Sequence, residues 1–101
     1  MTLPPAPQIH ARPDETAEAR LKRMQMRAWR RGMKEMDLIL GPWAEADLAS
    51  LDAETLDLVD RLLTENDQEI LPWFIGQAVP PAHYAALIER IGIFARGRLI
   101  R

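Results

Sequence analysis

The chain has 101 residues, of which 48% are hydrophobic and 28% are charged, a composition typical of one globular domain and not of a disordered or membrane protein. It contains no cysteine, which excludes disulfides and thiolate metal sites and favours a reducing compartment. The two histidines, His10 and His83, lie too far apart for the spacing of a zinc site, so we expect no bound metal.

The net charge of −2 is unevenly distributed along the chain. Residues 1–35 hold eight Lys or Arg against four Asp or Glu, a net charge of +4, whereas residues 36–101 hold five against eleven, a net charge of −6. An acidic second part disfavours a nucleic-acid binder, which needs a basic surface to contact phosphates. A basic first part fits a charged protein partner, or is simply a solvated helix face of mixed charge.

The first 13 residues are rich in proline and lack apolar periodicity, which predicts an extended, poorly ordered tail. This tail has neither the apolar centre of a secretory signal nor the length and Arg and Ser content of a transit peptide. No apolar run approaches the about 20 residues of a transmembrane helix, so we expect no membrane insertion.

A first helix is expected from Asp14, as its cap, to about Arg30. One apolar line recurs at helical spacing and should face inward: Ala17, Leu21, Met24 and Ala28. A second line follows at the same spacing: Met26, Trp29 and Met33. This second line is either covered by the bundle or left partly exposed as a binding face.

The organising feature is the stretch Arg30-Arg31-Gly32-Met33-Lys34-Glu35, which predicts a corner between two helices. Gly32 can end the first helix with a positive φ and act as N-cap of the next, which would begin at Met33. Glu35 would then lie in the first turn, near the positive end of the helix dipole. A corner that presents Arg31 and Glu35 on a protruding tip either has only a structural role, as a connection between helices, or is a contact surface for a partner.

The second helix should carry Met36, Leu40 and Trp43 inward and continue as far as Ala49, with a kink or restart at Pro42. A third helix, capped by Asp52, should end near residues 65–66. Its inward line is Leu56, Val59 and Leu63, and its solvent-facing residues are Asp57, Asp60 and Arg61.

A short, distorted fourth helix should follow, capped by Asn66 or Asp67 and ending at Gly76, with an unexplained proline at Pro72. Its buried residues should be Ile70, Trp73 and Phe74. A fifth helix should run from about Ala82 to Arg96, closed by Gly97 and followed by a frayed tail over 98–101. Its inward residues should be Leu87, Ile88, Ile91 and Phe94 or Ala95.

No alternation of apolar and polar residues is long enough to indicate a β-strand. The sequence therefore predicts an all-α fold: a small five-helix bundle in a single domain over 14–97. No phosphate-binding loop, nucleophile elbow or paired histidines appear, so we do not expect an enzyme. A helix-turn-helix DNA binder is also disfavoured, because the arginines of the first helix lie among bulky apolar residues.

Three features in order resemble one known family. The run Arg31-Gly32-Met33-Lys34-Glu35 resembles the RGxxE signature of the succinate dehydrogenase assembly factor 2 family, also called FAD assembly factors or flavinators. The stretch 66–73 is similar to the family's second characteristic segment, and Pro42 falls where members carry a proline. The resemblance covers roughly residues 20–96, and Pro72 departs from it.

The resemblance implies a five-helix protein that is not itself an enzyme. Members bind the flavoprotein subunit of succinate dehydrogenase, or of the related fumarate reductase in bacteria, and promote covalent attachment of FAD to it. It implies that FAD belongs to the client, with no cofactor bound stably by the factor. We accordingly expect a bacterial cytoplasmic protein whose partner-binding residues are the signature positions Arg31, Gly32 and Glu35, to which we add the neighbouring cation Arg30.

Our hypothesis assigns each signature residue a role. Arg31 would contact the client, Glu35 would orient Arg31 or bind a client cation, and Gly32 would let the two backbones approach closely. Replacing Gly32 with a bulkier residue should then abolish flavinylation and leave the domain folded. The alternative is a helical regulatory or antitoxin-like module that binds a different protein through the same face.

Overall fold

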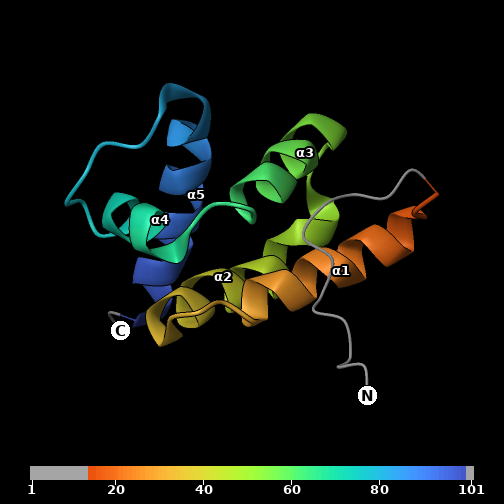
Figure 1. Ribbon diagram of the computed structural model, residues 1–101, viewed down its shortest axis with the longest axis horizontal. Coiled ribbons are helices and arrows are strands. Elements are labelled where there is room, and N and C mark those ends of the chain that lie inside the picture. Colours follow the sequence, from red (N-terminus) through yellow and green to blue (C-terminus); the bar gives the residue numbers. More distant parts are fainter. Residues whose placement is uncertain (1–13, 100–101) are drawn as a thin grey trace, which may run out of the picture.

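The computed structural model describes residues 14–99, and their side chains as far as residue 97 (Figure 1). The predicted tail over 1–13 and the last two residues lie outside the described part. Within it the fold is all-α, as predicted, and none of its helices has the length and apolar character needed to cross a membrane. The helices are α1 (Ala17–Trp29), α2 (Lys34–Asp47), α3 (Ala53–Leu62), α4 (Asp67–Phe74) and α5 (Ala82–Leu99), with a 3-10 turn, Leu48–Ser50, after α2.

The helices α1 and α2 form a hairpin along one side of the molecule, and α3, α4 and α5 lie against it (Figure 1). Trp43 of α2 lies at the centre of the core and is 1% exposed. The lines predicted to face inward in α2 and α5 are buried, although Phe94 is only partly so. Tyr84, which the periodicity did not single out, is also buried, and its hydroxyl donates a hydrogen bond to Glu65 at 2.9 Å.

The boundaries at the first corner differ from the prediction. The N-cap of α1 is Thr16 and not Asp14, because its hydroxyl accepts a hydrogen bond from the Ala19 N–H at 3.0 Å. The helix ends at Trp29, and α2 begins at Lys34 with Met33 as its cap. Gly32 is therefore neither the end of one helix nor the cap of the next, and it does not adopt a positive φ.

Two prolines lie inside helices without ending them. The helix α2 continues through Pro42, so the predicted restart does not occur, and the proline is buried with the core-facing residues. Pro72 lies near the end of the eight-residue α4. There its carbonyl accepts the Gln77 N–H at 2.9 Å, and Gly76 takes the left-handed conformation (φ 80°), which confirms the predicted stop.

The remaining boundaries are partly as predicted. Asp52 caps α3 by accepting the Thr55 N–H at 2.7 Å, and Asn66 caps α4 by accepting the Gln68 N–H at 2.8 Å. The last helix, however, continues through Gly97 to Leu99. Gly97 therefore does not close it, and residues 98 and 99 are helical.

Candidate functional site

The four predicted partner-binding residues lie on the connection between α1 and α2 and on the first turn of α2. Arg30, Gly32 and Glu35 are exposed. The side chains of Arg30 and Glu35 form no hydrogen bond or ion pair with any other residue of the described chain. This corner therefore presents two cations, Arg30 and Lys34, the carboxylate of Glu35 and a bare backbone segment at Gly32 to solvent.

Arg31 does not share this exposure, and the prediction that it points outward is wrong. Its side chain is 3% exposed, and its Nε donates to Asp67 Oδ1 at 2.6 Å. Its two terminal nitrogens donate to the carbonyl oxygens of Leu63, at 2.7 Å, and Glu65, at 2.8 Å. Leu63 is the C-cap of α3 and Glu65 lies in the turn after it, where carbonyls have no helical partner, so the guanidinium satisfies acceptors that the end of the helix leaves open.

Two carboxylates hold the backbone of the same connection. The second oxygen of Asp67 accepts the Gly32 N–H at 2.6 Å, and Asp37 accepts the Arg31 N–H at 2.7 Å. Asp67, from α4, therefore orients Arg31, a role that we had predicted for Glu35. These bonds tie the corner to α2, α3 and α4, so its exposed groups are held on a rigid support.

Gly32 has no evident structural need to be glycine. A Cβ at this position would come within 3.5 Å of Asp67 Oδ2, which is ordinary van der Waals contact. Its φ is not positive, so an L side chain would not strain the backbone. A Cβ at position 32 therefore meets no obstacle in the described part of the domain.

A buried ion cluster joins α1 to α3, and sequence reasoning missed it. Arg23 donates to both oxygens of Asp60, at 2.7 and 2.6 Å, and to Glu15 at 2.7 Å. Arg20 bonds Asp57 at 2.6 Å and Asp60 at 3.2 Å. Asp60 is 7% exposed, so the prediction that it faces water is wrong.

The electrostatics of this cluster follow from its geometry. Burial disfavours the ionised carboxylate of Asp60, but hydrogen bonds and charge interactions with Arg23 and Arg20 outweigh it and hold its pKa below the usual value. The hydrogen bond to Asp60 likewise raises the pKa of Arg23. The cluster sets the position of α1, and no three acidic or histidine side chains of the described residues are arranged to hold a metal ion.

The second apolar line of α1 is left partly exposed and is not fully covered by the bundle. Met26 is 43% exposed and Trp29 is 40% exposed, whereas Met33 packs against the core. Met26 lies one helical turn before Arg30, and Trp29 immediately precedes it. An apolar strip therefore leads directly into the corner.

Comparison with known proteins shows one family. The family model described as the flavinator of succinate dehydrogenase matches residues 22–95. Succinate dehydrogenase assembly factor 2-B, mitochondrial, of Drosophila mojavensis is 35% identical over 89 residues, which cover 86% of this chain and 57% of that protein. Succinate dehydrogenase assembly factor 2, mitochondrial, of Cryptococcus neoformans var. neoformans serotype D (strain B-3501A) is 31% identical over 101 residues, covering 96% and 58%. No solved structure matches the chain significantly.

Two further facts about these relatives bear on the predictions: their length and their location. The chain spans little more than half the length of these two relatives, 57% and 58%. The predicted bacterial cytoplasmic location is contradicted, because both relatives, and a further one from Mycosarcoma maydis that is 33% identical over 84 residues, are eukaryotic proteins named as mitochondrial.

Proposed function

Because the chain belongs to the family of succinate dehydrogenase flavinators, we propose that it is an assembly factor that promotes covalent attachment of FAD to the flavoprotein subunit of succinate dehydrogenase or fumarate reductase. The observation that carries this proposal is the family match over residues 22–95, which includes the whole α1–α2 corner. No observation favours a regulatory or antitoxin-like module with a different client.

The factor acts by binding and not by catalysis. Covalent flavinylation requires a client side chain to be held against the flavin, and a partner that restricts the client's motion accelerates such a step through orientation alone. In this proposal the chemistry and the FAD stay with the client, and the factor binds no FAD stably. Arg30 and Glu35 contact the client, and Gly32 lets its backbone come close.

The rigidity of the corner supports this proposal. Arg31 and Asp67 hold the connection through a hydrogen bond of 2.6 Å, so the backbone that carries the exposed groups is already fixed before a client arrives. A preorganised surface loses less conformational entropy on binding. Arg31 is accordingly a supporting residue, and not a direct contact as we had predicted.

The test is covalent flavin in the client, measured as in-gel fluorescence of the flavoprotein subunit after co-expression with the factor. Gly32→Glu should abolish the signal, because the side chain occupies the space that the client needs, while the thermal melting of the isolated factor stays near wild type. The matched control is Gly97→Glu, since Gly97 is also exposed and no atom lies within 4 Å of a Cβ there. Wild-type fluorescence with a folded Gly32→Glu variant would contradict the proposal.

A further inference from the structure

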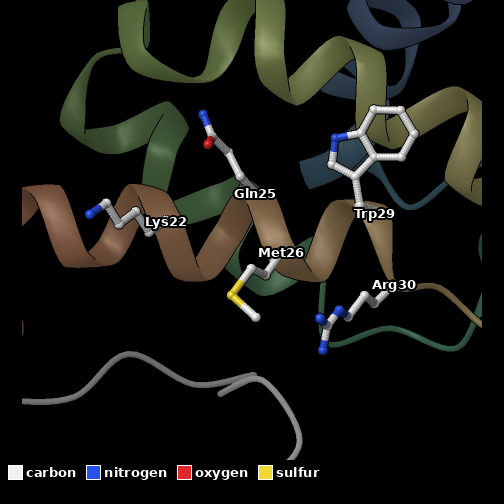
Figure 2. A pocket seen from close by; sticks show the side chains of 5 residues that line it. All are labelled: Lys22, Gln25, Met26, Trp29 and Arg30. Carbon is white, nitrogen blue, oxygen red and sulfur yellow. The ribbon is translucent and has the colours of Figure 1, made fainter.

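A shallow apolar hollow lies on the outer surface of α1, beside the corner. It has a volume of about 420 Å³ and is lined by Lys22, Gln25, Met26, Trp29 and Arg30 (Figure 2). Figure 2 shows that all five side chains come from successive turns of α1, with the indole of Trp29 on the side that faces α2. A hollow built on one rigid helix keeps its shape when a partner approaches.

Trp29 is held in place by α2 although it is partly exposed. A Cβ at Gly41 would lie 2.4 Å from the ring atom Cδ2 of Trp29, so the indole fits against α2 only because residue 41 is glycine. Its N–H also donates to Glu45 at 3.2 Å. A tryptophan that is already ordered and still 40% exposed has the properties of an interface anchor.

The charges around the hollow indicate what it accepts. Its two charged lining residues, Lys22 and Arg30, are basic, and none of its lining residues is acidic. Lys22 has one ionic neighbour, Glu18 at 3.6 Å, and both side chains are highly exposed, so this pair is strongly screened. Arg30 forms no ion pair with any described residue. The complementary occupant is an apolar side chain flanked by carboxylates.

The hollow is continuous with the corner, because Arg30 belongs to both. Arg30, Gly32 and Glu35 alone are too few for a stable complex, since a standard interface uses roughly 20–30 residues on each side. We propose that the hollow is a second contact for the same client, and that it receives an apolar side chain from an acidic segment of the flavoprotein subunit. This inference rests on the proposed function and adds a binding site to it.

The test compares affinities for the purified flavoprotein subunit, measured by titration calorimetry with the full chain. Met26→Ser should weaken binding roughly tenfold, because it removes the apolar surface that the client covers. Met26→Leu should restore it. The matched control is Val79→Ser, which also removes an exposed apolar side chain, 91% exposed, on the connection between α4 and α5. If binding depended only on the amount of exposed apolar surface, Val79→Ser would weaken it more than Met26→Ser, because Val79 is the more exposed side chain.

The outcomes separate the two proposals. Failure of the wild-type chain to bind the subunit would overturn both. Tight binding by wild type and by a folded Met26→Ser variant, with binding lost in Gly32→Glu, would overturn the hollow alone. Light scattering on the free chain gives a further check: if Met26→Ser abolished self-association and left client binding intact, the occupant would be a second copy of this chain, and the proposal would again be wrong.

Discussion

At the scale of single residues, the most informative side chain is Arg31, because its surroundings change the meaning of the signature. A sequence motif that contains an arginine suggests a direct contact with a partner. In the fold, this guanidinium is 3% exposed and is bonded to a carboxylate of α4 and to two carbonyl oxygens at the end of α3. Under the proposed function, Arg31 therefore supports the corner and does not contact the client.

We expect Arg31→Ala to lower the free energy of unfolding by about 2–4 kcal/mol, because Asp67 loses its cationic partner and two carbonyls lose their donors. Denaturant titration measures this loss. Arg31→Lys should recover only part of it, since an ammonium cannot bond all three acceptors in the same planar arrangement. If Arg31→Ala kept wild-type stability but abolished client flavinylation, this prediction would be wrong. Arg31 would then contact the client directly.

Gly41 leads to a second prediction at this scale. In most helices Gly→Ala is stabilising by about 0.5–1 kcal/mol. Here the added Cβ would collide with Trp29, so we expect Gly41→Ala to destabilise the domain by about 1–2 kcal/mol. Thermal unfolding of a double-mutant cycle checks the cause: in a Trp29→Ala background the same substitution should be neutral or stabilising. An unchanged loss in that background would exclude the contact with Trp29 as the reason.

At the scale of elements, α1 is attached to the body at both of its ends. Near its start, Arg20 and Arg23 bind the acidic residues of α3. Just after its end, Arg31 binds Asp67 of α4. The intervening turns pack Met24 and Ala28 into the core. The opposite side of α1 keeps Met26 and part of the Trp29 indole exposed, although the indole packs against Gly41 of α2.

The ion cluster makes the stability of the fold dependent on pH. Asp60 has a lower pKa in the folded chain than in the unfolded one, where it is about 3.9. Its stabilising contribution is therefore present above pH about 4 and is lost as the pH falls through its folded-state pKa. Asp60→Asn should reduce stability at pH 7 by roughly 3 kcal/mol and flatten the acid limb of the stability curve. Unfolding followed by circular dichroism at pH 7, 4 and 3 measures both effects, and an unchanged acid limb would contradict this assignment.

At the scale of the whole molecule, the charge asymmetry acquires a different interpretation. The sequence divides into a first part of net charge +4 and a second part of −6. Three of the arginines in the first part, Arg20, Arg23 and Arg31, are paired with aspartates of α3 and α4. Much of the asymmetry therefore serves to hold the domain together. Among the other basic residues of this part that the structure describes, Lys22, Arg30 and Lys34 are exposed, and Lys22 and Arg30 lie beside the apolar hollow.

The sequence by itself determined the features that depend on near neighbours: the helical class, the cap Asp52, the start of α4 at its cap Asn66 or Asp67, the stop at Gly76, and most of the inward-facing lines. It also identified the corner and the family. Only the tertiary structure decided which charged groups are buried and which are free. Arg31 and Asp67 are 36 positions apart, and Arg23 and Asp60 are 37 apart. The helical period specifies which face of its own helix a side chain occupies. The ion pairs of a long basic side chain form only when elements distant in the sequence pack together.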